Sequence, residues 1–281
     1  MELFQQLTFL ERGIIAGLII GIICPLLGAF LLVRRITIIS EALSHITLTG
    51  ITAGVFLSQA IVWLNFLNPL YTGFLFSLIG SLLVEKIRQL YKHFQELAIP
   101  IILSSGIGLS AILISFTQSS YNEWYSYLFG SIVTVSLHDL IFIIFTGIIA
   151  FLILGAFYKE LLSISFDQEF AKTSGISVGR LNFYFAVLIA LVISMSMKVV
   201  GILLVGAMVT LPVAASIQLA KSFRQVILLA ILFGEIAMIA GITISYYLNI
   251  ATGGVIVVTG VILLLVAGVI KRIKLSFRAV S

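Results

Sequence analysis

Long apolar runs separated by short polar loops make up almost the whole chain. Most runs approach the roughly 20 residues that an α-helix needs to cross a bilayer. They are too long, and too rich in Gly and Phe, for the alternating strands of a β-barrel. The pattern therefore predicts an all-α, polytopic membrane helix bundle. The predicted spans cover residues 13–33, 42–64, 70–84, 98–117, 138–157, 182–197, 199–219, 226–247 and 254–270.

Two of these segments leave the number of spans open at eight or nine. Residues 70–84 are short for a span. Residues 182–219 form one apolar tract that is interrupted only around Met195–Lys198. Nine spans, or eight spans plus a short or re-entrant piece, are both compatible with the pattern.

The composition agrees with a membrane protein and excludes several other classes. Of the 281 residues, 61% are hydrophobic and 10% are charged, whereas soluble domains carry about 25% charged residues. We therefore expect residues 1–281 to form a single transmembrane domain. The lone Cys24 excludes an internal disulfide and a multi-cysteine metal cage. No G-x-x-x-x-G-K-[ST] nucleotide motif is present, so a separate chain must supply any ATPase.

The positive charges of the loops predict the topology, and they need no nucleic-acid partner. Fourteen of the 16 Lys and Arg residues fall in alternate loops, which the positive-inside rule assigns to the cytoplasm. Arg12 and Lys198 are the two exceptions. The rule predicts an outside N-terminus and an inside C-terminus. The cytoplasmic groups are Arg34/Arg35, Lys86/Arg88/Lys92, Lys159/Lys172/Arg180, Lys221/Arg224 and Lys271/Arg272/Lys274/Arg278.

Glu41 and His45 are the principal candidates for chemistry. They are four residues apart, so a helix places them on one face, one turn apart. Carboxylate and imidazole are common ligands of zinc, manganese and iron, and ionisable groups inside a bilayer are functional candidates. If the chain is helical from Arg35, His45 lies about 15 Å deeper. A structural Glu at the interface and a backbone-bonded His are the alternative.

Two further polar residues are weaker candidates for a metal path. Thr49 continues the face of Glu41 and His45 and offers a hydroxyl ligand. Glu235 follows Gly234 in a predicted span, far from either interface. A protonated or hydrogen-bonded structural glutamate is the alternative for Glu235.

The polar segment 165–178 is expected to form a short cytoplasmic docking helix. Asp167 is placed to cap its N-terminus, Glu169 to favour its first turn and Gly175 to end it. Phe166 and Phe170, four apart, form an apolar stripe suited to a groove of a soluble partner. A plain connecting loop is the alternative.

Four motifs in order resemble the permease subunits of the ABC-3 family of metal importers. The likeness extends over nearly the whole chain. The departures are Glu41, where the family usually has Asp, and Thr49, where manganese-type members often have Pro; Thr49 therefore favours zinc slightly. The four motifs are Gly28–Arg35 with Ser40–His45, Tyr127–Ser136, Phe166–Gly175, and Lys198–Val205 with Leu211–Pro212.

The resemblance implies a type II-like ABC importer permease in a bacterial inner or plasma membrane. It implies a homodimer, a cytoplasmic ATP-binding subunit on each protomer, and an extracytoplasmic metal-binding protein. Zinc, or manganese as the second candidate, would pass Glu41 and His45 by an alternating-access mechanism. The permease itself would not be an enzyme and would hold no permanent cofactor. Segment 165–178 would be the coupling helix.

Two other classes of membrane protein are alternatives to this one. A proton-coupled secondary transporter of metal ions would use Glu41, His45 and Glu235 as a proton relay. It leaves the polar segment 165–178 without a role. An intramembrane metalloprotease would need an H-E-x-x-H signature, and no second His lies near His45.

Overall fold

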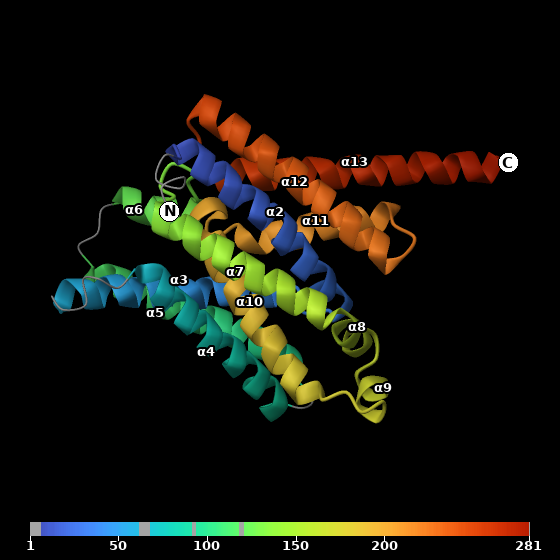
Figure 1. The fold of residues 1–281 in the computed structure, drawn as a ribbon, viewed down its shortest axis with the longest axis horizontal. Helices are drawn as coiled ribbons and strands as arrows, with labels where there is room; N and C mark the ends of the chain where they lie inside the picture. The colour runs from blue at the N-terminus through green and yellow to red at the C-terminus, as the bar shows by residue number, and fades with distance from the viewer. Residues whose placement is uncertain (1–6, 62–67, 92–93, 118–120, 281) are drawn as a thin grey trace.

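The computed structural model describes residues 7–61, 68–91, 94–117 and 121–280. Within these ranges the chain forms helices joined by short connections (Figure 1). The long helices are α2 (Phe9–Val33), α3 (Ile39–Ala60), α4 (Pro69–Leu90), α5 (Ala98–Phe116), α7 (Leu137–Ala156), α10 (Val178–Val200), α11 (Val205–Leu219), α12 (Phe223–Leu248) and α13 (Thr252–Val280). The short ones are η2 (Gln95–Leu97), α6 (Tyr121–Phe129), α8 (Tyr158–Phe166) and α9 (Gln168–Thr173).

The long helices form two groups that α10 joins. One group contains α2, α11, α12 and α13, and the other contains α3, α4 and α5 (Figure 1). Helix α10 packs against α2 on one side and against α3 and α4 on the other, while α7 covers α2 and α10. Helix α3 also touches α11 directly, so the two groups meet along an α3–α11 seam.

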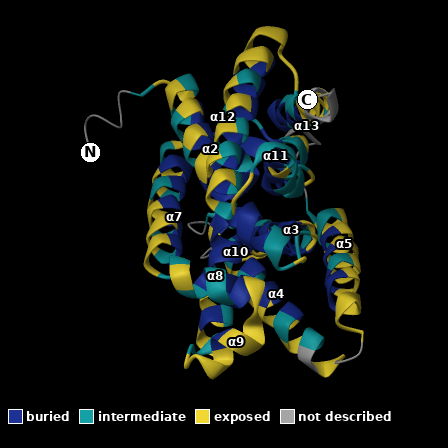
Figure 2. Ribbon diagram, turned by 90° about the vertical axis from the view of Figure 1, so that its right-hand side faces the viewer, coloured by how far each residue is buried: buried dark blue, intermediate teal, exposed yellow. Residues whose placement is uncertain are grey.

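Burial follows this arrangement (Figure 2). Helices α2 and α10 bury most of the residues in their apolar windows, whereas α5 and α13 bury only 22% of theirs. The exposed large hydrophobic residues of α5 and α13 are mostly Ile, Leu and Val. Apolar side chains on the outside of a bundle are the arrangement that lipid requires.

Each expected apolar segment of the described chain corresponds to a helix. Seven of the described helices are long and apolar enough to cross a membrane. Helix α3 has 22 residues, which is long enough to cross a membrane. It is not among the seven because its Ser, Thr, Glu and His residues make it less apolar. Helix α11 has 15 residues and reaches only about 22 Å.

Two details of the expected spans need correction. Segment 70–84 was judged short, but helix α4 runs from Pro69 to Leu90, because Asn68 caps it and it continues through Lys86 and Arg88. The break in 182–219 was expected around Met195–Lys198. Instead α10 continues to Val200 and the chain breaks at Gly201, whose φ of 88° ends the helix.

The charged loops gather at two ends of the bundle, as alternate crossings require. At one end a single cavity is lined by Arg34, Arg88 and Asn182, which come from three different helix ends. At the other end Lys198 pairs with Asp139. The first end is the one that the positive-inside rule places in the cytoplasm.

Glycines bring the helices into close contact at several points. Gly21 faces Glu235 of α12, and Gly50 lies against Thr72 and Gly73 of α4. Small residues allow such approach between helices in lipid. Helices α2 and α3 both bury a large part of their surface inside the bundle.

Candidate functional site

Glu41 and His45 lie on the first two turns of α3, at the cytoplasmic end of the bundle. Their spacing places both on one face. Glu41 is exposed and His45 is half-buried. The serines beside them are buried, and Ser44 donates to the Ser40 carbonyl at 2.8 Å. The two ionisable residues therefore occupy the accessible side of the helix, and the hydroxyls the packed side.

His45 lies shallower than the 15 Å expected from a helix that begins at Arg35. Arg35 has a left-handed φ of 56°, and the amides of Arg35 and Ile36 bond to Leu32 and Leu31 carbonyls, which ends α2. Because α3 starts only at Ile39, His45 is about 9 Å from the start of its helix.

Helix α11 leaves space opposite Glu41 at the α3–α11 seam. A Cβ placed on Gly206 would lie 3.6 Å from the Cβ of Glu41, at ordinary contact distance. A larger residue at position 206 would extend toward Glu41. Sequence reasoning missed Gly206, although it directly follows the Lys198–Val205 motif.

Thr49 continues the Glu41–His45 face, but it is engaged with helix α5. Its hydroxyl donates to the Gly106 carbonyl at 2.9 Å and to the His45 carbonyl at 3.1 Å. Only its lone pairs are left for an ion. The side chain is 2% exposed, so its role here is to join α3 to α5 beside His45.

The described residues of one protomer provide few metal ligands. Nowhere in the described ranges do three His, Cys, Asp or Glu residues come together in a way that would hold a metal ion. Glu41 and His45 supply two donors, whereas a closed zinc site uses four. An incomplete donor set agrees with transient contact rather than with a structural metal site.

Glu235 lies apart from α3. It is half-buried on α12 and faces α2, where a Cβ on Gly21 would lie 2.6 Å from its Oε1 atom. Among the described residues this buried Oε1 atom has no hydrogen-bond partner. The structure therefore places Glu235 in the α2–α12 contact and not beside Glu41 or His45.

Segment 165–178 contains the short helix α9, with both expected caps. Asp167 accepts from the Phe170 amide at 2.9 Å. Gly175, at φ 82°, follows the helix end, and the Ile176 amide bonds back to the Ala171 carbonyl. Glu169 lies in the first turn.

The expectation that Phe166 and Phe170 form one stripe on a single helix is wrong, because the two residues lie in different helices. Phe166 ends α8, and Asp167 separates it from α9, because Asp167 adopts an extended conformation. Phe166 packs edge-on against Phe223, with ring centroids 5.8 Å apart. Both rings are nevertheless about two-thirds exposed at 64% and 63%, so an apolar surface is present.

The opposite end contains an ion pair that sequence reasoning missed. Lys198 Nζ lies 3.2 Å from Asp139 Oδ2 and 5.3 Å from the Tyr127 ring centroid. Asp139 also caps α7 through Ser136. The signal was available, since Lys198 is one of only two cations on that side and Asp139 an acid at the same edge.

Comparison with known proteins agrees with this arrangement. The ABC 3 transport family matches residues 6–271. The manganese transport system membrane protein MntC of Listeria monocytogenes is 31% identical over 95% of this chain and 92% of its own. The manganese import system permease protein ScaB of Streptococcus gordonii is 32% identical, over 92% of this chain and 90% of its own.

A solved structure shows the same fold. PsaBC from Streptococcus pneumoniae, solved in complex with a Fab, is 30% identical to this chain, with a TM-score of 0.80. The match covers 94% of this chain and 92% of that chain. The fold and the polar face of α3 define a multi-pass membrane permease. This chain belongs to the ABC 3 transport family.

Proposed function

We propose that the protein is the translocation subunit of an ATP-driven importer of a divalent metal cation. The observation that carries this proposal is the accessible Glu41–His45 pair, at a helix seam where Gly206 leaves room opposite Glu41. A carboxylate and a neutral imidazole bind first-row divalent ions. Two donors per protomer bind such an ion weakly enough for it to leave.

A homodimer would complete the donor set. Glu41 and His45 of two copies supply four donors, enough for transient coordination between the protomers. No permanently bound cofactor is needed, since the ion is the cargo. We further propose that residues 1–281 act as one permease domain, with segment 165–178 as its coupling helix.

Manganese is the first candidate for the transported ion and zinc the second. The two relatives described above, MntC and ScaB, are named as manganese systems. The expectation of zinc depended only on Thr49, at a position where manganese-type members of the family often have Pro, and neither relative described above is named for zinc. Donor chemistry alone does not separate the two ions, because delivery and geometry govern selectivity in such sites.

The remaining components would be separate chains. A cytoplasmic ATPase would bind at α9, where Phe170 is exposed. An extracytoplasmic metal-binding protein would deliver the ion at the Lys198–Asp139 end. Membrane lipid surrounds the exposed apolar faces. Hydrolysis of ATP would change the open side of the bundle, and the permease would perform no chemistry itself.

The test is reconstitution of the permease in liposomes with its ATPase and metal-binding protein. We expect uptake of manganese, and less of zinc, that requires ATP and persists when an ionophore removes the proton gradient. Permease alone, given a proton gradient, is the control. Gradient-driven uptake by that control would show that the protein is a secondary transporter and would refute the proposal of an ATP-driven importer.

A further inference from the structure

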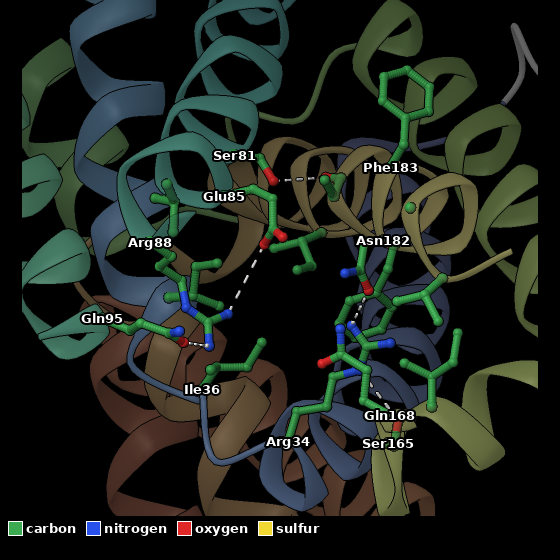
Figure 3. Close-up of a pocket in the computed structure, with 18 of the residues that line it drawn as sticks. Arg34, Ile36, Ser81, Glu85, Arg88, Gln95, Ser165, Gln168, Asn182 and Phe183 are labelled. Atoms are coloured by element: carbon green, nitrogen blue, oxygen red, sulfur yellow. Dashed lines mark hydrogen bonds and ion pairs between the residues drawn. The ribbon is translucent and has the colours of Figure 1, made fainter. Parts of the chain in front are cut away.

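Arg34 carries a partly buried guanidinium that contacts two helices, α8 and α10, at the end of the bundle that the positive-inside rule places in the cytoplasm. It follows the last residue of α2, at Val33, and its side chain points inward beside the cavity (Figure 3). Its Nε donates to Ser165 Oγ and its Nη1 to Asn182 Oδ1, both at 3.2 Å. The guanidinium also lies over the Phe185 ring, 4.3 Å from the centroid.

Ser165 and Asn182 lie on either side of helix α9 along the chain. Ser165 lies in the last turn of α8, two residues before the Asp167 cap of α9. Asn182 lies in the second turn of α10, which follows α9 after a short connection. Arg34 is therefore hydrogen-bonded to α8, which precedes α9, and to α10, which follows it.

The other side of Arg34 leads directly to the metal-ligand helix. Only Arg34–Ile38 separate α2 from α3. Within this turn the Ile39 amide bonds to the Ile36 carbonyl, and the Ser40 hydroxyl bonds to the Thr37 carbonyl at 2.7 Å. A turn bonded in this way is stiff, so a displacement of Arg34 moves the start of α3, where Glu41 lies.

Helix α4 leaves space beside this connection. A cavity of about 770 Å³ has Arg34, Asn182 and Gln168 on one wall and Glu85 and Arg88 on the other (Figure 3). The space allows α9 and the α2–α3 turn to shift relative to the end of α4.

Burial makes the retention of a cation here costly. The pKa of Arg34 is lowered to about 10, chiefly by burial. The Glu85 carboxylate opposes this shift, and the Arg88 guanidinium adds to it. The group stays charged at neutral pH and is bonded to neutral acceptors. Among the described residues its buried Nη2 atom has no partner. Packing alone does not require such a group, since an apolar side chain would fill the space at lower cost.

We propose that Arg34 is a positioning residue that transmits movement of the coupling helix α9 to α3 and its pair Glu41 and His45. The inference rests on the proposed function, since it assigns α9 to the ATPase and α3 to the ion. A lysine cannot replace it, because one ammonium does not reproduce the planar fork that reaches Ser165 and Asn182 together.

The test compares Arg34→Gln and Arg34→Lys with Arg35→Gln in the reconstituted complex. Arg35 is exposed and adjacent, so its change removes the same charge outside the contact. We expect both Arg34 variants to retain the ATPase subunit and to hydrolyse ATP. Metal carried per ATP should fall by about tenfold, within the usual range of coupling between sites. The Arg35 variant should match the wild type.

Two results would overturn the proposal. One is wild-type metal transport per ATP in Arg34→Gln. The other is loss of the ATPase subunit in proportion to transport, which would make Arg34 a docking residue. If Arg34→Gln does not fold, Ser165→Ala combined with Asn182→Ala gives the decision, because it keeps the guanidinium and removes both acceptors.

A readout without metal separates this proposal from the proposed function. Single cysteines replace Leu57 on α3 and Thr173 on α9, both exposed, and the buried Cys24 stays unreactive. In the wild-type complex, ATP should change the thiol-labelling rate at both sites; in Arg34→Gln it should change only the rate at Thr173. Change at both sites in the variant refutes the role of Arg34. No change in the wild type refutes ATP-driven alternating access itself, and this proposal with it.

Discussion

At the residue scale, the molecule places its few membrane-embedded ionisable groups in two different settings. Glu41 and His45 face the accessible side of α3, and Glu235 faces α2 across the Gly21 contact. All three are expensive in lipid. Only the first two lie together on one face, where an ion can be shared between them.

His45→Ala should abolish metal uptake while the complex still assembles. Removing a direct ligand should cost more than the roughly 10- to 100-fold that loss of an outer partner costs a metal site. Uptake of radioactive manganese into proteoliposomes measures it. Wild-type uptake should also weaken on acidification, because a protonated imidazole does not bind metal.

His138→Ala is the matched control for this change. His138 is exposed in the first turn of α7, at the opposite end. Its loss should leave uptake unchanged. Equal effects of the two substitutions would remove His45 from the ion path.

Gly206→Leu should reduce uptake, whereas Gly206→Ala should be tolerated. A Cβ at position 206 reaches ordinary contact with Glu41, so a methyl group fits, but a leucine must enter the space opposite the carboxylate. Uptake should be compared at equal amounts of assembled complex. Full activity of the leucine variant would show that this space is not on the ion path.

Glu235→Gln should leave ATP-driven uptake near the wild-type level. Gln has nearly the same shape and keeps the contact with Gly21, and the importer needs no proton relay. The measurement is uptake with and without a proton gradient. A selective loss of uptake in an assembled complex would instead support the secondary transporter.

At the element scale, short connections between helices determine where the functional groups lie. The α2–α3 turn sets the start of α3, and the α10–α11 break sets the position of Gly206. At that break the amides of Ile202 and Leu203 bond to the carbonyls of Tyr127 and Leu128 in α6. Gly130 and Gly201 both have positive φ where their backbones meet, which favours glycine at each position.

The Lys198–Asp139 pair should stabilise this outer junction. The side chains of Lys198 and Asp139 are 18% and 2% exposed, so Lys198→Met strands a buried carboxylate. Removing one partner of a buried pair costs about 3–5 kcal/mol. Thermal unfolding of the purified permease in detergent measures the loss.

The cycle also needs the single variant Asp139→Asn, and it is completed by the double variant Lys198→Met with Asp139→Asn. The double variant should recover most of the lost stability, because no unpaired charge remains and the asparagine can still cap α7. Strictly additive losses would mean that the two side chains are not coupled.

At the scale of the whole molecule, the two ends of the bundle carry different features. The cytoplasmic end carries α9, the cavity and Arg34, and the other end carries the ion pair and α6. The long apolar faces between them contact lipid. In the proposed mechanism, movement produced at one end must pass along the helices to change access at the other.

Phe170→Asp should detach the ATPase or uncouple it. The ring is exposed on α9, and a carboxylate in its place removes apolar contact area from a groove. Co-purification of the ATPase and metal carried per ATP measure the effect. Phe94→Asp is the control, since Phe94 is 60% exposed between α4 and η2; equal effects of both changes would refute the docking role of α9.

Much of the architecture followed from the sequence because the bilayer leaves few solutions. Backbone groups in lipid must bond within their own segment, so long apolar runs become helices, as α2 and α12 did. The Asp167 and Gly175 caps of α9 were also predictable, since capping depends on residues close in sequence. The pairing of Glu41 with His45 on one face followed from helical spacing alone.

Only the tertiary structure decided what lies opposite these residues. Gly206 meets Glu41, Asp139 meets Lys198 and Arg34 meets Asn182 across long stretches of chain. It also showed that His45 lies closer to the start of its helix than expected, because a left-handed turn at Arg35 ends α2 before α3 begins. The physical reason is that periodicity and capping are local, whereas contacts between helices depend on how the whole bundle packs.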